Sequence, residues 1–201
     1  MSQHSESPTI QYYDKHSEEY IGSTVSIDME TLYYPFLNGL PEGGSILDAG
    51  CGSGRDTKNF LDAGYSVTSI DASSEMVAAT TRLSGQAAKK MQLQKIEFQE
   101  EFDGIWACAS LLHVPLVEME DVIVRLACAL RPDGLCYLSF KEGQGERFQG
   151  DRLFVDFTEL ALRDWVNRQP SLASLRTWVT TDLRPGETQR WVNTLARKSS
   201  D

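Results

Sequence analysis

Short apolar runs alternate along the chain with amphipathic segments, and Gly, Ser or Pro stands at most of the boundaries. Five runs have the length and content of buried strands: residues 45–50, 65–71, 89–98, 102–114 and 135–143. Four segments have the polar and apolar spacing of helices: residues 55–64, 73–85, 118–134 and 158–170. Because strand and helix take turns, we expect an α/β fold with a mostly parallel sheet.

Both ends of the chain depart from this alternation. Before the first strand, residues 9–24 and 28–40 have helical spacing. At the other end, residues 175–198 predict two strands around a turn at residues 184–186, and so short a connection implies a C-terminal antiparallel hairpin. The sequence contains no internal repeat and no low-complexity linker, so we expect one domain over residues 1–201.

Length and charge narrow the function classes. With 201 residues and 41% hydrophobic content, the chain can bury a substantial core. Its 29 acidic and 19 basic side chains give a formal net charge of -10, which opposes extended contact with a nucleic-acid backbone. Residues 141–201, however, hold ten basic against nine acidic side chains. We therefore expect no free DNA or RNA partner, whereas an anionic small molecule would meet local positive charge near the C-terminus.

Other features favour a cytoplasmic protein. The first residues, MSQHSESPTI, lack a basic start and an apolar stretch, and no segment approaches the ~20 apolar residues that span a bilayer. Four cysteines stand singly in apolar runs, without the spacing of a zinc site or a disulfide framework: Cys51, Cys108, Cys128 and Cys136. We expect no membrane partner and no metal, and the sequence leaves the oligomeric state open.

The turn after the first strand, GCGSG, is the first candidate binding site. In an open parallel sheet, ligands lie beyond the carboxyl ends of the strands. Gly50, Gly52 and Gly54 would let a ligand approach main-chain N–H groups at a helix start, although such a turn also serves as a plain strand-to-helix connection. Asp71 ends the next strand, where an acid accepts hydrogen bonds from both hydroxyls of a ribose; its alternative role is to cap the following helix.

Two residues bear on which nucleoside binds. Asp48, two residues before the first glycine, would repel the pyrophosphate of a dinucleotide, and Arg55 stands where the G-x-G-x-x-G pattern needs its third glycine. A dinucleotide reductase is therefore a distant alternative. S-adenosylmethionine has no phosphate, and its sulfonium and ammonium groups suit an acid beside a bare backbone.

Several segments resemble one family. The sequences ILDAGCGSGRDT, VTSIDAS, FDGIWACASLLHV and LRPDGLCYLSF together are similar to the class I S-adenosylmethionine-dependent methyltransferases, over roughly residues 10–197. The resemblance implies a Rossmann-like, doubly wound, mostly parallel seven-stranded sheet in residues 45–197 and an N-terminal helical lid in residues 1–40. In detail, YYDKHSEEY and SFKEGQGERFQGDRLFVDFTE look similar to small bacterial methyltransferases of type 11 and 12, also described as tellurite-resistance-like.

The resemblance also implies a site for S-adenosylmethionine and its product S-adenosylhomocysteine. Its expected contacts are Asp48, Gly50, Cys51, Gly52 and Gly54 in the turn, Asp71 on the ribose, Ala72 and Met76 along the adenine, and Ala109, Ser110 and Leu111 after the fourth strand. Family members commonly have an Asp after the third strand that bonds the adenine amino group. Here Lys95 aligns with it, which leaves either an adenine contact by the main chain of Ile96 or a shifted alignment.

Methyl transfer needs a positioned acceptor more than a dedicated base, because the leaving group is already activated. His113, at the end of the fourth strand, is the best-placed base, with local packing as its alternative role. Tyr13 is the second candidate catalytic residue, and Tyr12 and Tyr20 are candidates for acceptor binding. All three tyrosines lie on the expected lid helix, where they could equally form an apolar covering face.

Basic residues after the fifth strand are the other candidates for acceptor binding. Lys141, Arg147 and Arg152 lie among flexible glycines in an expected loop, residues 141–152, and Arg184 and Arg190 of the hairpin could join them to bind an acidic group. Solvated surface charge is the alternative for all five. The four tryptophans lie in apolar elements and are expected in the core: Trp106, Trp165, Trp178 and Trp191.

The leading hypothesis is a methyltransferase that uses S-adenosylmethionine and acts on a small-molecule acceptor: a metabolite, a thiol or a metalloid oxyanion. A tRNA or protein methyltransferase would keep the cofactor site but needs a larger docking surface, and the net charge disfavours tRNA. A catalytically inactive cofactor-binding subunit is a third hypothesis, because the sequence carries no motif that proves turnover.

Overall fold

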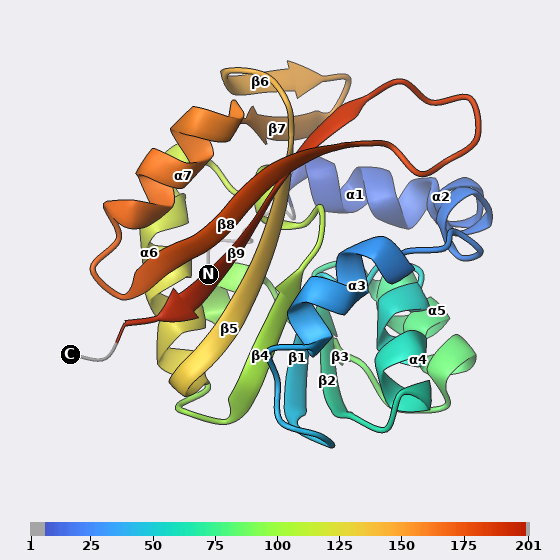
Figure 1. Ribbon diagram of the computed structural model, residues 1–201. Helices are drawn as coiled ribbons and strands as arrows, with labels where there is room; N and C mark the ends of the chain where they lie inside the picture. The colour runs from blue at the N-terminus through green and yellow to red at the C-terminus, as the bar shows by residue number, and fades with distance from the viewer. Residues whose placement is uncertain (1–6, 200–201) are drawn as a thin grey trace, which may run out of the picture.

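The computed structural model describes residues 7–199, which form a seven-stranded sheet in the order β3-β2-β1-β4-β5-β9-β8 (Figure 1). The first five of these strands pair in parallel, whereas β9 is antiparallel to both β5 and β8. The strands of this sheet are β1 (Ser45–Ala49), β2 (Ser66–Asp71), β3 (Lys89–Lys90), β4 (Phe102–Ala107), β5 (Leu130–Lys141), β8 (Leu172–Thr181) and β9 (Arg190–Lys198). The expected α/β fold, with seven strands and a C-terminal antiparallel hairpin, is confirmed.

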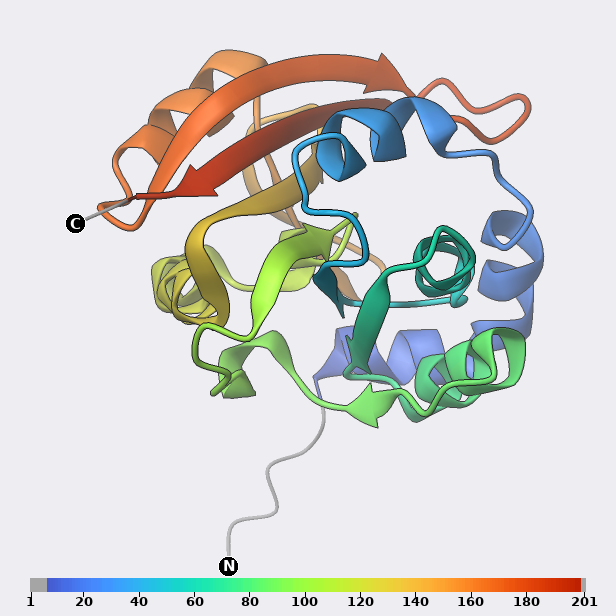
Figure 2. The same cartoon turned by 60° about the horizontal axis from the view of Figure 1, so that its bottom comes forward.

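Helices cover both faces of the sheet, as Figure 2 shows from its end. Alternate residues of the central strands supply two separate cores. Ile46 and Trp106 face one side and pack with α3 and α4, whereas Leu47 and Ile105 face the other and pack with α6 and α7. The helices are α1 (Pro8–Lys15), α2 (Ser17–Thr24), α3 (Glu30–Leu37), α4 (Arg55–Asp62), α5 (Ser74–Ser84), α6 (Leu116–Ala129) and α7 (Glu159–Asn167).

The first helical segment is broken. The sequence predicts one helix over residues 9–24, but α1 and α2 are separated at His16, whose backbone leaves the helical region. The ring Nδ1 of His16 donates a hydrogen bond to the carbonyl of Tyr12, at 2.9 Å, and so satisfies a carbonyl at the end of α1. The break lets α1 run across α5 and β7, at the end of the sheet where α2 also lies (Figure 1).

The third strand is much shorter than the sequence predicts. Of residues 89–98, Lys89–Lys90 alone form β3, and a 3₁₀ turn, η1 (Leu93–Lys95), follows. β3 is an edge strand of two exposed lysines, and Ile96 reaches the core from a segment outside the strand. Alternating apolar residues therefore misled the prediction here.

Residues 141–152, expected as a flexible loop, enter a second small sheet. Its strands β6 (Gly145–Gln149) and β7 (Arg152–Asp156) pair in antiparallel around Gly150, which has φ 60°. Hydrogen bonds tie the hairpin to the rest of the chain: among them, Leu153 N–H donates to Oγ1 of Thr9 at 3.0 Å, and Leu116 N–H donates to Glu146 at 2.8 Å. It therefore lies over the same end of the sheet as α1 (Figure 1).

The expectation that the chain starts without a targeting segment concerns residues that lie partly outside the described part of the chain. Most of the polar opening of the sequence, residues 1–6, is not among the described residues, and neither are residues 200–201. Across residues 7–199, no helix has both the length and the apolar character that a membrane crossing requires.

Candidate functional site

The glycine turn between β1 and α4 is shaped by close packing. Gly50, Gly52 and Gly54 all have positive φ, at 97°, 52° and 84°. A Cβ on Gly50 would lie 2.4 Å from the Cβ of Ser110, and a Cβ on Gly54 would lie 2.7 Å from the Cα of Thr80. Gly50 thus permits Ser110 to pack against the turn, and Gly54 permits Thr80 of α5 to do the same.

A cavity of about 500 Å³ lies beyond the carboxyl ends of β1, β2 and β4, and we call it the larger cavity. Its floor is the glycine turn, and α1 contributes its roof, including Thr9 and Ile10. Seven of the twelve expected cofactor residues line it: Gly50, Gly52, Asp71, Ala72, Met76, Ala109 and Ser110. The position agrees with the rule that ligands bind where the parallel strands end.

Asp71 is the charged group at the centre of this cavity. Its two oxygens accept hydrogen bonds from the N–H groups of Gly52, at 3.0 Å, and Ser73, at 2.9 Å. Burial raises its pKa, against the opposing effect of these main-chain bonds. A carboxylate has about four lone-pair sites, so both oxygens keep the capacity to accept a further hydroxyl group.

Five expected cofactor residues do not line the larger cavity: Asp48, Cys51, Gly54, Ile96 and Leu111. Ile96 and Leu111 are core residues, buried to 1% and 0% exposure, and Met91 to Gln94 take the place on the cavity wall that we expected for Ile96. The thiol of Cys51 is buried and accepts a hydrogen bond from Thr80, at 3.2 Å. These five residues therefore support the residues that line the larger cavity and do not line it themselves.

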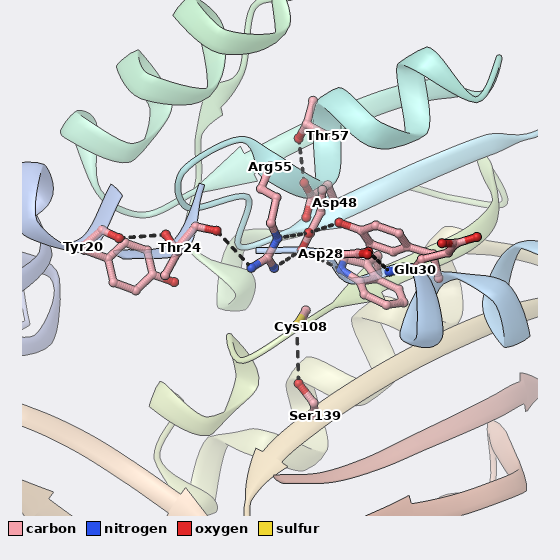
Figure 3. Close-up of polar contacts among 12 residues, drawn as sticks. Tyr20, Thr24, Asp28, Glu30, Asp48, Arg55, Thr57, Cys108 and Ser139 are labelled. Carbon is pink, nitrogen blue, oxygen red and sulfur yellow. Dashed lines mark hydrogen bonds and ion pairs between the residues drawn. The ribbon is translucent and has the colours of Figure 1, made fainter. Parts of the chain in front are cut away.

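The correction at Asp48 follows from strand alternation. Ile46 and Asp48 point to the same side of β1, toward α4, where Oγ1 of Thr57 donates to Asp48 at 2.6 Å (Figure 3). Burial, with the nearby charge of Asp56, raises the pKa of Asp48 and favours its neutral form. Asp48 therefore bonds α4 to the sheet and does not line the larger cavity, so its expected contact with a cationic ligand stays a prediction.

The sequence analysis missed Asp14. This residue of α1 accepts hydrogen bonds from the hydroxyl of Ser73, at 2.6 Å, and the N–H of Glu75, at 3.2 Å. It thus caps the N-terminus of α5 from another helix and fixes α1 over the larger cavity. No local signal could have revealed the pair, because 59 positions separate Asp14 from Ser73.

A second cavity, of about 170 Å³, adjoins the first, and we call it the smaller cavity. It lies between α2, the end of β4 and the loop that joins β8 to β9. Tyr13, Tyr20, Ala109 and His113 line both cavities and so form the wall between them. Ala109 has φ 52°, a strained value for a residue with a side chain, and its N–H donates to Ser139 at 2.8 Å.

The two candidate catalytic residues meet in this shared wall. Oη of Tyr13 lies 2.8 Å from Nε2 of His113, and Nδ1 of His113 lies 2.7 Å from the carbonyl oxygen of Leu153. Because a carbonyl only accepts, Nδ1 carries the proton and Nε2 accepts from Tyr13. Burial lowers the pKa of His113 to about 4, so the ring is neutral at pH 7.

The five expected basic residues separate into two groups. Lys141, Arg152 and Arg184 line the smaller cavity, whereas Arg147 and Arg190 do not. Arg184 pairs with Asp182 at 2.6 Å, and Arg190 pairs with Glu142 at 2.8 Å. Surface charge is thus the better description of Arg190.

Two aromatic expectations also change. Tyr12 lines neither cavity, and instead its ring stacks on His16 and carries the guanidinium of Arg152 at 4.2 Å from its centroid. Trp191, expected in the core, is partly exposed and lines the smaller cavity, where its ring N–H donates to Asp182 at 3.0 Å. Trp106 and Trp165 are core residues as expected.

Arg55 forms the floor of the smaller cavity. Its guanidinium makes two bonds to Asp56, at 2.6 and 3.0 Å, and one to the carbonyl of Thr24, at 3.4 Å (Figure 3). Asp56 also accepts hydrogen bonds from the hydroxyl of Tyr33 and the ring N–H of Trp106. These two bonds, together with the charge and bonds of Arg55, lower the pKa of Asp56. Arg55, which stands where the dinucleotide pattern needs a glycine, therefore has a structural role, and its charge is balanced by Asp56.

The site agrees with sequence relationships. The family described as "Methyltransferase domain" matches residues 46–134, which include the glycine turn, Asp71 and His113. Residues 46–134 of this chain, a little under half of its length, therefore match a methyltransferase domain. YqeM of Bacillus subtilis, named as a candidate methyltransferase, is 31% identical over 104 residues, 48% of this chain. That match spans 42% of YqeM, less than half of its length.

Solved structures share the fold of this methyltransferase domain. The 1,6-didemethyltoxoflavin-N1-methyltransferase of Burkholderia thailandensis, with bound S-adenosylhomocysteine, has a TM-score of 0.76 and 23% identity, covering 95% of this chain and 85% of its own. A methyltransferase of Methanosarcina mazei reaches 0.71 with 21% identity, covering 87% and 100%. The [4+2]-cyclase SpnF reaches 0.74 with 17% identity, covering 97% and 98%. The finer resemblance to type 11 and 12, tellurite-resistance-like proteins stays a prediction.

Proposed function

We propose that this chain transfers a methyl group from S-adenosylmethionine to a small-molecule acceptor. The observation that carries the proposal is the shared wall: the larger cavity adjoins the smaller one at Tyr13 and His113. A cofactor in the larger cavity and an acceptor in the smaller one would meet at these side chains. The toxoflavin methyltransferase of the same fold, whose structure contains a small-molecule ligand beside S-adenosylhomocysteine, supports an acceptor of that size.

The cofactor would be held by main chain and carboxylate. Asp71 accepts the ribose hydroxyls, Ala72 and Met76 lie along the adenine, and Gly50 and Gly52 leave room for the methionine part. S-adenosylmethionine supplies a methyl group on a sulfonium sulfur that leaves without protonation. The chain's remaining task is to orient the acceptor, exclude water and receive a proton where the acceptor has one to lose.

Tyr13 and His113 provide that proton route. As the acceptor atom forms its bond to the methyl carbon and the carbon–sulfur bond breaks, the acceptor proton passes to Oη of Tyr13 while the Tyr13 proton passes to Nε2 of His113. Leu153 keeps the opposite nitrogen protonated, so Nε2 is free to accept. Tyr20 lines both cavities together with Tyr13, Ala109 and His113, and its ring narrows the opening between them.

We also propose that residues 1–201 act as one domain in which residues 1–40 form a lid over the core of residues 45–197. The bonds from Asp14 to Ser73 and from Thr9 to Leu153 support this arrangement, because they close α1 over the larger cavity.

The test combines binding with transfer. Calorimetry is expected to give micromolar affinity for S-adenosylhomocysteine, and methyl-labelled cofactor is expected to label the small-molecule fraction of a cell extract. Label confined to the tRNA or protein fraction would assign a macromolecular acceptor. Binding without any transfer would identify a cofactor-binding subunit, and the absence of binding would overturn the whole proposal.

A further inference from the structure

Four cationic residues line the smaller cavity, and two of them, Lys141 and Arg152, lack the paired carboxylate that Arg55 and Arg184 have. Arg55 is neutralised by Asp56 and Arg184 by Asp182, both at 2.6 Å. For Lys141 and Arg152 there is no ion pair with any residue from 7 to 199. The protein as a whole has a net charge of -10, so two uncompensated cations in one enclosed site are a local exception.

One carboxylate, Asp156, acts on Lys141 but forms no ion pair with Lys141 or Arg152. Asp156 is 5% exposed; one of its oxygens accepts from Nε of Arg147, and the other has no hydrogen-bond partner among the described residues. Lys141 and Arg152 are held instead by the ring of Phe154, at 3.9 and 5.2 Å from its centroid. Burial and the like charges of Arg147 and Arg152 lower the pKa of Lys141, so an anion placed beside it would relieve an existing repulsion.

Arg152 also has an unused donor. Its Nε is buried and makes no hydrogen bond to any of the residues that the structure describes. A buried guanidinium N–H without a partner is costly, and a bound carboxylate or phosphate oxygen is the acceptor that its geometry suits. His113 adds no charge of its own here, because its ring is neutral.

We propose that Lys141 and Arg152 bind an oxyanion of the methyl acceptor, so that the substrate is a small carboxylate or phosphate compound. The inference rests on the proposed function and defines its substrate class. The anion would lie next to Tyr13, which both cavities share, and this places the reacting atom of the acceptor close to its charged group.

The uncharged part of the acceptor is small and apolar. Phe154, Tyr137 and Trp191 line the smaller cavity, whose volume is about 170 Å³. Engineered protein cavities of roughly 150 Å³ hold a benzene molecule. A single ring or a short chain with one oxyanion therefore fits, whereas a longer acceptor would have to extend outside.

Matched probes test the charge requirement. With S-adenosylhomocysteine at saturation, NMR titration would compare benzoate and phenylphosphate with benzamide, which has the same ring without the charge. Benzoate or phenylphosphate is expected to bind at least tenfold more tightly than benzamide, and the better of the two identifies a carboxylate or a phosphate substrate. Equal affinity for all three probes, or binding of none, would overturn the inference.

Variants assign the effect to the cavity. Lys141→Gln is expected to remove the preference for the anion, and Lys141→Arg to retain most of it, because the positive charge stays. Arg163→Gln, which removes an exposed cation from α7, is the control and should change nothing. All three variants are expected to bind S-adenosylhomocysteine as the wild type does. Loss of that binding would count against the proposed function, whereas loss of the anion preference alone concerns only this inference. An anion preference that survives in Lys141→Gln would contradict the assignment.

Discussion

The hydroxyl of Tyr13 donates to Nε2 of His113 at 2.8 Å, although 100 positions separate the two residues. Their bond closes the wall between the larger and smaller cavities. It joins α1 to the turn that follows β4, and the carbonyl of Leu153 in β7 fixes the tautomer that makes it possible. Three segments therefore have to be in place before His113 can accept a proton from Tyr13.

Removing the Tyr13 hydroxyl tests this proton route. Tyr13→Phe keeps the ring that lines both cavities, and it is expected to lower kcat by ~100-fold or more, the usual range for general base catalysis. Affinity for S-adenosylhomocysteine should change little. Tyr34→Phe, at a residue that is 70% exposed, is the matched control. A Tyr13→Phe enzyme with the turnover of the wild type would show that the acceptor loses no proton through this pair.

The protonation of His113 predicts a pH dependence of catalysis. Because its pKa is lowered to about 4, the ring is neutral and can accept from neutral pH down to about pH 5, and kcat should fall as the pH drops through about 4. His113→Gln offers Tyr13 a hydrogen-bond acceptor but no base, and it should be slow at every pH. A wild-type profile that instead falls near pH 6.5 would contradict the buried, neutral ring.

The same pKa predicts a pH dependence of stability. The unfolded chain takes up a proton on this histidine near pH 6.5, whereas the folded protein resists it until about pH 4. The free energy of unfolding should therefore decrease as the pH falls from about 6.5 to 4, by about 3 kcal/mol. Urea unfolding of wild type and His113→Gln across this range isolates the contribution, since the variant lacks it. Parallel curves for the two proteins would refute the prediction.

Asp71 is expected to provide much of the cofactor affinity. Asp71→Asn keeps the shape of the side chain but removes its charge, and charge-assisted hydrogen bonds contribute roughly 1.5–3 kcal/mol. Calorimetry should therefore give a Kd for S-adenosylhomocysteine about 10- to 150-fold higher. Asp62→Asn, which removes an exposed carboxylate on α4, serves as the control. Equal Kd values for Asp71→Asn and wild type would remove Asp71 from the binding site.

The contact of Gly50 with Ser110 predicts a steric effect. Gly50→Ala would place a Cβ 2.4 Å from the Cβ of Ser110 and at a positive φ, and is expected to lower the free energy of unfolding by more than ~2 kcal/mol. Gly85→Ala has a similar φ, 75°, but open space, and should lose only about 1 kcal/mol. Chemical denaturation compares the two. Equal losses would mean that backbone strain alone, without the contact, explains Gly50.

Prediction from the sequence succeeded where the signal is local. Apolar runs bounded by glycine located the central strands, and the place of Asp71 at the end of β2 put it in the larger cavity. The sequence did not reveal that Asp48 lies outside the lining of the larger cavity, because charge and distance along the chain from the glycines do not show on which side of β1 a side chain lies.

Other parts of the site depend on contacts that no local pattern encodes. The bonds from Asp14 to Ser73 and from Thr9 to Leu153 appear only once distant segments are folded together. Residues 141–152 were expected to form a loop, because their glycines and charges hide a short hairpin of which one strand is exposed. Charge alone likewise could not separate Lys141 from Arg190.

The carbonyl of Leu153 that orients His113 lies outside residues 46–134, the part of the chain that matches the methyltransferase family. Tyr13, Lys141 and Arg152 are also outside it, whereas Asp71 and the glycine turn are within. The proposed placement of the acceptor therefore predicts that exchanging α1 and the β6–β7 hairpin between relatives changes the acceptor and keeps the cofactor. In such a chain the segment that would bind the cofactor can stay constant during evolution while the segments that would bind the acceptor change.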